Sequence, residues 1–329
     1  MFVDTRFGDK KRYYLFPPKD ANMRLPNEFT EGIVFVGRVI SKGDREERPL
    51  LGTAFVVGIP SEDGSPGFYR YLVTARHVAK QLSLGGPWFI RMNKKDGESV
   101  DVQSESPVQW WYHATEAETV DVAVTPLPSL PEEIEYRIIE SALFATDAVI
   151  RQRNIGYGDP VFIIGLFTRM AGKRRNFPIV RMGNIALMPA ERIPGIEIDA
   201  EHAVESDVYL IEARSVGGLS GSPIFVRETV FLPMPVGKDS RRVEALLPGS
   251  FFLLGLMHGH WDVKEQEINE VQVRAVRRDR MGVNLGVAVV VPAQKIHEVL
   301  CHPELVKERR RADQARIAAE GTTIPDLRV

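Results

Sequence analysis

The stretch GGLSGSPIF (residues 217–225) places one serine inside a glycine-rich turn that leads into an apolar segment. Glycine accepts backbone conformations that other residues do not, so Gly217, Gly218 and Gly221 predict a tight turn and not the interior of a helix or strand. Two interpretations follow. The turn is either a plain entry into the next strand, or a loop that exposes Ser220 Oγ beside backbone N–H groups.

Short β-rich segments separated by Gly, Pro and Asp extend in both directions from this turn. Eleven segments predict strands, at residues 32–40, 52–59, 70–75, 87–93, 120–127, 160–167, 178–188, 208–213, 222–228, 251–259 and 285–291. Many short strands with turn signals between them favour antiparallel sandwiches or barrels. They form two groups on either side of a connector at residues 135–159. We therefore expect an all-β protein with two packed antiparallel six-stranded barrels.

Helical patterns appear only after the last of these strands. Residues 292–300 place Ile296, Val299 and Leu300 on one face behind a proline, and a highly charged helix begins near Pro303 and ends at Gly321. The expected domains are an N-terminal extension (1–30), a first barrel with its connector (31–147), a second barrel with its terminal helix (148–301) and a charged helical tail (302–329).

Composition describes an ordinary globular protein. The 329 residues are 44% hydrophobic and 26% charged, and a formal charge of −2 gives no sign of a general affinity for nucleic acid or anionic membranes. The single cysteine, Cys301, excludes an intramolecular disulfide. The first residues lack the apolar core of a signal peptide, and no apolar run is long enough to span a bilayer. We expect a cytoplasmic protein without metal or cofactor, with export from a bacterial cell by another route as the alternative.

A nucleophilic serine needs a general base, and His77 is the best placed of the seven histidines. It closes the apolar segment YLVTARHVA (71–79), where small neighbours leave room for its ring. Asp121 opens the apolar run DVAVTPL, where an unpaired charge is costly, so it fits the acceptor that orients such a histidine. Taken singly, a residue such as His77 is more often a packed, hydrogen-bonded histidine, and one such as Asp121 is more often a turn residue or an acceptor at a strand start. His113 is a rival base for which a surface or packing role is favoured.

The order and spacing of the three residues along the chain favour a common role. Asp121 follows His77 by 44 positions, and Ser220 follows Asp121 by 99. With this order the chain resembles the chymotrypsin-like serine peptidases, in particular their disulfide-free bacterial, Deg-like branch. The matching segments span residues 31 to 301 and are GTAFVVG, YLVTARHV, TVDVAV, PIVRMGNIAL, IEARSVGGLSGSPIF, LLGLMHGH and LGVAVVVPAQKIHEVL.

The resemblance implies a mechanism in which Ser220 attacks the scissile carbonyl, His77 transfers the proton and Asp121 orients His77. The N–H groups of Gly218 and Ser220 would then form the oxyanion hole. The chain departs from digestive members of the family at Leu219, where they carry an aspartate that pairs with a newly cut N-terminus. A leucine cannot form that ion pair, so control by loop ordering, by a partner or by the tails is the remaining hypothesis.

The spacing from Ser220 places the substrate pocket at Arg214 and Ser215, with His258 and Gly259 on the facing wall. Such a pocket favours an acidic side chain before the cleaved bond, unless Arg214 is paired with Glu212 or another carboxylate. The expected partners are a protein or peptide substrate and a regulatory partner bound through residues 1–30 or 302–329. The alternative function is a latent or inactive protein of the same fold that binds peptides without cutting them.

Overall fold

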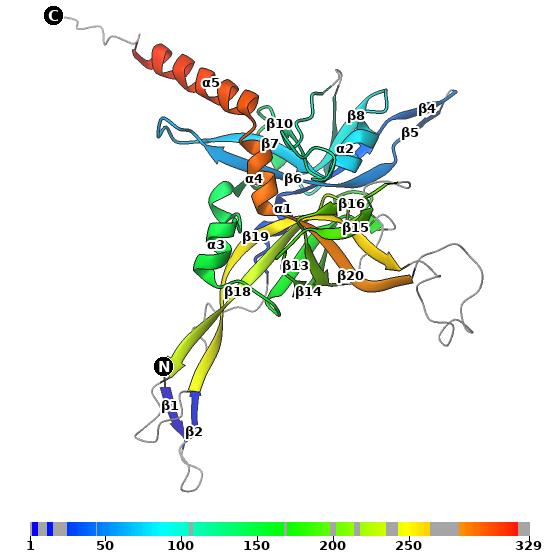
Figure 1. The fold of residues 1–329 in the computed structure, drawn as a ribbon. Coiled ribbons are helices and arrows are strands. Elements are labelled where there is room, and N and C mark those ends of the chain that lie inside the picture. The colour runs from blue at the N-terminus through cyan, green and yellow to red at the C-terminus, as the bar shows by residue number, and fades with distance from the viewer. Residues whose placement is uncertain are drawn as a thin grey trace, which may run out of the picture.

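The computed structural model describes residues 2–5, 12–15, 25–43, 45–104, 108–167, 170–197, 202–213, 218–234, 243–263 and 283–321. Figure 1 shows a β-rich molecule with two groups of strands and two helices at the C-terminal end. No helix in these ranges is both long and apolar enough to cross a lipid bilayer.

The first half of the chain builds an eight-stranded sheet. Its main path runs in the order β10-β7-β6-β3-β8-β11, with β9 paired to β8 and β12 paired in parallel to β6. The strands are β3 (Ile33–Arg38), β6 (Leu50–Pro60), β7 (Phe68–Thr74), β8 (Trp88–Lys94), β9 (Ser99–Gln103), β10 (Ala123–Pro126), β11 (Ile134–Glu135) and β12 (Ile139–Glu140).

The second half builds a closed six-stranded barrel in the order β13-β14-β17-β20-β19-β18, with β18 paired back to β13. Its strands are antiparallel, as expected. They are β13 (Pro160–Gly165), β14 (Ile179–Leu187), β17 (Tyr209–Glu212), β18 (Pro223–Met234), β19 (Val243–Val263) and β20 (Val283–Pro292). In Figure 1 the hairpin of β18 and β19 extends well beyond the barrel.

Two six-stranded barrels were expected, and the described pairings close one. In the first half, they do not join the end strands β10 and β11 within the described residues. The outer edge of β10 is instead occupied by an isolated bridge, in which Trp111 and Val124 exchange N–H···O bonds of 2.8 and 2.9 Å. The irregular segment between β9 and β10 therefore covers the edge that a closing strand would need.

Other short elements complete the chain. Three two-stranded ladders pair β1 (Phe2–Thr5) with β2 (Arg12–Leu15), β4 (Ile40–Lys42) with β5 (Arg45–Glu47) and β15 (Ile193–Glu197) with β16 (Ala203–Ser206). The helices are α1 (Glu28–Glu31), α2 (Arg76–Leu82), η1 (Ser141–Leu143), α3 (Asp147–Arg153), α4 (Ala293–Leu300) and α5 (Pro303–Gly321).

Strand alternation divides the apolar side chains between two cores. On β18, Ile224 and Val226 point into the barrel, whereas Phe225 between them belongs to the core of the first half. On β19, Leu254 lies in the barrel and Leu253 in the other core. Successive strand residues face opposite sides, so one strand contributes to both. The outer face of the barrel is thus packed against the first sheet, which fixes the two halves relative to each other.

Helices α4 and α5 begin and end where the sequence predicts. The buried face of α4 includes Ile296, Val299 and Leu300, and these side chains belong to the core of the first half. Helix α5 is anchored by Arg309, whose guanidinium donates to the hydroxyl of Tyr71 at 2.9 Å and to the carbonyl of Leu300 at 3.0 Å. The charged tail is therefore docked on the first sheet over at least its first turns.

Candidate active site

His77 lies in the first turn of helix α2, directly after β7. The sequence analysis placed it at the end of the strand; the chain instead turns at Ala75 and enters a helix whose Val78, Ala79 and Leu82 are buried. The first N–H groups of a helix have no partner within it. The N–H of His77 is one of these, and it donates to Asp121 Oδ1 at 2.9 Å.

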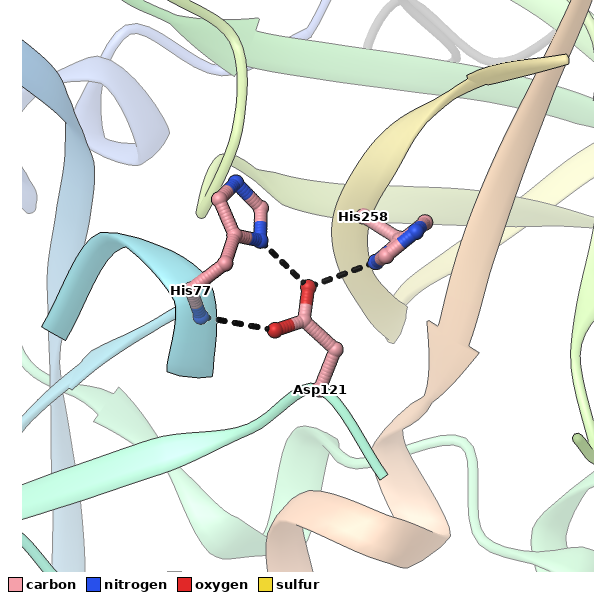
Figure 2. Close-up of side chains that lie close together, drawn as sticks. All are labelled: His77, Asp121 and His258. Carbon is pink, nitrogen blue, oxygen red and sulfur yellow. Dashed lines mark hydrogen bonds and ion pairs between the residues drawn. The ribbon is translucent and has the colours of Figure 1, made fainter. Parts of the chain in front are cut away.

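Asp121 holds His77 at two points. In addition to the backbone bond at Oδ1, its Oδ2 lies 2.8 Å from Nδ1 of the His77 ring (Figure 2). A carboxylate only accepts, so Nδ1 carries the proton and Nε2 of the neutral ring is left as a proton acceptor. Asp121 therefore fixes both the position and the tautomer of His77.

His258 on β19 is a second histidine bound to Asp121. Its Nδ1 lies 2.6 Å from Asp121 Oδ2, the same oxygen that faces His77, and its Nε2 lies 2.7 Å from the carbonyl oxygen of Glu197 at the end of β15 (Figure 2). The ring is only 9% exposed. We call His77, Asp121 and His258 the Asp121 cluster. The pocket role predicted for His258 stays a prediction, and in this structure the protein engages both of its ring nitrogens.

Burial and charge oppose each other in the Asp121 cluster. Burial by itself would raise the pKa of Asp121, but the charges and hydrogen bonds of His77 and His258 hold that pKa well below its usual range. Burial would lower the pKa of His258, but the Asp121 carboxylate and the Glu197 carbonyl raise it above its ordinary value. Both effects favour an ionised carboxylate facing His77.

Ser220 lies in a turn that the first half of the molecule holds in place. We call residues 218–222 the serine loop. Thr53 on β6 donates from its backbone N–H to Ser220 O at 3.0 Å and from its hydroxyl to Gly218 O at 2.9 Å. The same hydroxyl accepts the N–H of Leu166 at 2.9 Å, just after β13. Thr53 thus ties the first sheet, the barrel and the serine loop to one another.

Two glycines of the serine loop have left-handed backbone conformations, with φ of +100° at Gly218 and +82° at Gly221. A Cβ atom on Gly221 would lie 2.2 Å from Thr53 O, so a side chain is excluded there as well as strained. Leu219 is 1% exposed and packs in the barrel core. The turn is therefore anchored by an apolar side chain.

The hydroxyl of Ser220 donates to the carbonyl oxygen of His258 at 3.3 Å. No hydrogen bond joins it to His77 among the described residues. Within the same ranges, the N–H groups of Gly218 and Ser220 have no backbone acceptor, and they remain available as donors to a ligand. The structure thus places Ser220 next to the Asp121 cluster through His258, with its hydroxyl turned to the backbone.

Two residues of the predicted substrate pocket, Arg214 and Ser215, lie outside the described residues. Gly217, the first glycine of the turn, lies outside them too. Gly259 is half-buried, and a Cβ atom built on it would meet nothing within 4 Å. Its place in a substrate pocket stays a prediction.

Sequence reasoning missed the bond between His258 and Asp121. The two residues are 137 positions apart. The signal that could have identified this bond is the pairing of β18 with β19. At the start of this pairing, Gly221 N–H donates to Met257 O at 2.9 Å, and Met257 N–H donates to Ser222 O at 2.8 Å. These bonds place the residue after Met257 beside Ser220. A prediction of the hairpin register would have placed His258 there.

His113 belongs to a second group, with Glu116 and Glu298, which we call the Glu298 cluster. His113 Nε2 lies 2.8 Å from Glu298 Oε2, and its Nδ1 accepts the N–H of Glu116 at 3.0 Å. Lys295 Nζ lies 2.5 Å from Glu116 Oε2. Both ring nitrogens are occupied within the protein, so His113 serves to join the segment before β10 to helix α4.

Both clusters bring three possible metal ligands within 4.8 Å of one another. In the Asp121 cluster these atoms already bind one another by hydrogen bonds. In the Glu298 cluster the Lys295 ammonium lies among them. In the Asp121 cluster the carboxylate is therefore satisfied by the two histidines. In the Glu298 cluster the Lys295 ammonium also pairs with the two carboxylates.

No protein-family model and no curated protein matches this chain.

Proposed function

We propose that the protein is a serine endopeptidase that cleaves peptide bonds through an acyl-enzyme intermediate. Ser220 is the nucleophile, His77 the general base and acid, and Asp121 the group that orients His77. The N–H groups of Gly218 and Ser220 form the oxyanion hole. No cofactor takes part in this chemistry.

The observation that carries the proposal is the two-point attachment of His77 to Asp121. The bonds of 2.9 Å to the backbone N–H and 2.8 Å to Nδ1 leave only Nε2 free to take a proton. A general base needs this open nitrogen and a fixed tautomer. A histidine with a purely structural role needs neither.

The serine loop supplies the second support. Thr53 holds the carbonyls of Gly218 and Ser220 from the opposite half of the molecule. Neither N–H group has a backbone acceptor among the residues that the structure describes, and we propose that both bind the oxyanion. Rigid donors that are in place before the reaction give the largest single contribution to acyl transfer, about 3–4 kcal/mol for each donor in related enzymes.

The bond from Ser220 Oγ to His258 O is long for a hydroxyl bond, at 3.3 Å. Rotation about one side-chain bond redirects the hydroxyl, and catalytic hydrogen bonds in unliganded enzymes often form only when the substrate binds. We therefore propose that substrate binding turns Ser220 Oγ from the His258 carbonyl to Nε2 of His77.

The substrate that we propose is a dedicated protein, cut after an acidic residue. Arg214 and Ser215 would line the pocket with Gly259, and this assignment rests on their spacing from Ser220 alone. Leu219 makes activation by N-terminal cleavage unsuitable, because it cannot pair with a new amino terminus. Control would then come from a partner that binds residues 1–30 or 302–329.

The same hydrogen bond favours a second candidate function. A serine whose hydroxyl is held by a backbone carbonyl is not poised to attack, and an inactive protein of this architecture would use the serine loop to bind a peptide. This candidate and the peptidase make opposite predictions for the reactivity of Ser220.

A fluorescent fluorophosphonate, which reacts only with an activated serine, tests the proposal. We expect the wild type to be labelled at Ser220, as mapped by mass spectrometry, and labelling to vanish in Ser220→Ala and His77→Ala. Loss of one member of such a triad lowers turnover by about 10⁴ to 10⁶. His113→Gln is the matched control, because it alters another buried histidine, and it should be labelled like the wild type.

Labelling that survives in His77→Ala, or a folded wild type that is not labelled, would contradict the peptidase. The second outcome would favour the peptide-binding protein. Circular dichroism on each variant distinguishes a lost base from a lost fold.

A further inference from the structure

His258 faces two groups that only accept hydrogen bonds. Its Nδ1 is 2.6 Å from a carboxylate oxygen of Asp121, and its Nε2 is 2.7 Å from the backbone carbonyl oxygen of Glu197. A neutral imidazole has one N–H and satisfies only one of them. Both contacts are of hydrogen-bond length, so the ring must carry protons on both nitrogens.

We propose that His258 is held as an imidazolium at neutral pH and that it is a positioning residue, which clamps Asp121 against His77. The inference rests on the proposed function for its effect on activity. The charge of His258 stands on the geometry alone.

Within the part of the chain that the structure describes, few charged and titratable groups face His258. Asp121 comes from the segment before β10, and His77 comes from α2, with a distance of 5.7 Å between the centroids of the two rings. Glu197 contributes its carbonyl, and the Ser220 hydroxyl contacts the carbonyl of His258 itself. The neighbouring acid raises the pKa of His258 against the effect of burial, in agreement with the two-acceptor geometry.

A permanent charge on His258 has a consequence for His77. It fixes Asp121 Oδ2 between two donors, so the carboxylate cannot turn away from His77.

The Glu298 cluster shows that this state is particular to His258. There the His113 ring meets one donor, the Glu116 N–H, and one acceptor, the Glu298 carboxylate. A neutral ring satisfies both. The contacts of His258 use two ring protons, whereas those of His113 use one.

The first test is ¹⁵N NMR of the histidine side chains in the full chain at pH 7.5. A free histidine is only about one-tenth protonated at this pH, one unit above its ordinary pKa. We expect one ring, identified as His258 by its loss in His258→Asn, to show two ring N–H protons and nearly equal nitrogen shifts. A His258 ring with one proton would overturn the proposal.

The second test is the rate of fluorophosphonate labelling against pH for the wild type and His258→Asn. Asparagine has a neutral N–H donor that can bind Asp121. The variant therefore removes the positive charge at this position but keeps a hydrogen-bond donor toward the carboxylate. We expect His258→Asn to be labelled more slowly than the wild type, because one of the two donors that hold Asp121 Oδ2 loses its charge. The difference should narrow as the pH rises and the wild-type ring loses its second proton. His113→Gln is the control and should be labelled like the wild type at each pH.

Equal labelling rates for the wild type and His258→Asn, or a difference that does not change with pH, would overturn the effect on His77. A folded wild type that does not react at any pH would overturn this effect together with the proposed function. The NMR result would still decide the charge of His258, so the two failures are distinguishable.

Discussion

The Asp121 cluster and the Glu298 cluster are built from the same kinds of residue and differ in what is left open. Each joins distant parts of the chain through a histidine bound to a carboxylate at 2.8 Å. In the Glu298 cluster both nitrogens of His113 have partners. In the Asp121 cluster, Nε2 of His77 has none among the described residues.

The groups that surround the two clusters also differ. Cations surround the Glu298 cluster, where Lys295 contacts Glu116 at 2.5 Å and Glu298 at 3.4 Å. The Asp121 cluster has a second histidine and the serine loop beside it. A buried histidine that is paired with a carboxylate is therefore not enough to identify a general base. The nitrogen of His77 that has no partner among the described residues is the feature that separates the two.

The largest expected difference between the clusters is the response to loss of the carboxylate charge. Asp121→Asn places an amide where Nδ1 of His77 needs an acceptor, which favours the wrong tautomer. In related chemistry this change lowers turnover by about 10⁴. We expect the second-order rate constant of fluorophosphonate labelling to fall by about that factor.

Glu298→Gln is the counterpart in the other cluster. It removes the carboxylate that faces His113 at 2.8 Å, and we expect labelling within a few-fold of the wild type. Similar losses in both variants would mean that the two clusters act as one structural unit, and the distinction between them would fail.

The second prediction concerns the serine loop, which only the Asp121 cluster has beside it. Gly221→Ala strains a backbone with φ of +82° and places a Cβ atom 2.2 Å from Thr53 O. Strain and overpacking together cost about 3–5 kcal/mol. We expect a lower midpoint of urea unfolding and the loss of labelling.

Gly97→Ala is the matched control, because Gly97 has a similar φ of +86° in the turn between β8 and β9, with nothing within 4 Å of its added Cβ. We expect a cost of about 1 kcal/mol there, from the backbone conformation alone. Equal costs at both positions would show that the contact with Thr53 does not constrain the serine loop.

The sequence predicted much of this fold because its signals are local. Apolar runs between turn residues indicated all eleven strands, which the structure confirms as parts of β3, β6, β7, β8, β10, β13, β14, β17, β18, β19 and β20. The periodicity behind Pro292 and the Pro303 and Gly321 boundaries indicated α4 and α5. Helices α2 and α3 were missed because each spans only seven residues, too few for a helical pattern. Strand β15, with the sequence IPGIE, was missed because its proline and glycine indicate a turn.

The parts that were not predictable depend on tertiary contacts. Whether the first sheet closes is decided by the bridge of Trp111 to Val124 at the edge of β10, which has no sequence pattern. The role of His258 depends on the register between β18 and β19 and on a carboxylate from the other half. His77 and Asp121 were identified from their positions beside apolar runs, and their pairing at 2.8 Å needed the fold.

The smallest expected effect is a pH-dependent loss of stability in His258→Asn. The variant loses the charge and the bond to Glu197, and a hydrogen bond with a charged group contributes about 1.5–3 kcal/mol. The pKa of His258 is raised in the folded state, so its contribution is complete below the unfolded value of about 6.5 and is lost as pH rises through the folded pKa. The pKa of Asp121 is lowered, so its contribution is present above about pH 3.9 and is lost on acidification.

The free energy of unfolding of the wild type should therefore exceed that of His258→Asn by the most between about pH 4 and 6.5, and the difference should narrow on both sides. Urea unfolding from pH 3.5 to 9 measures it. His113→Gln supplies the contrast, because the His113 ring pairs with one donor and one acceptor and needs no second proton. A difference that instead grows as pH rises through about 6.5 would mean that His258 is bound as a neutral ring, and the two clusters would then differ only in the nitrogen that His77 leaves open.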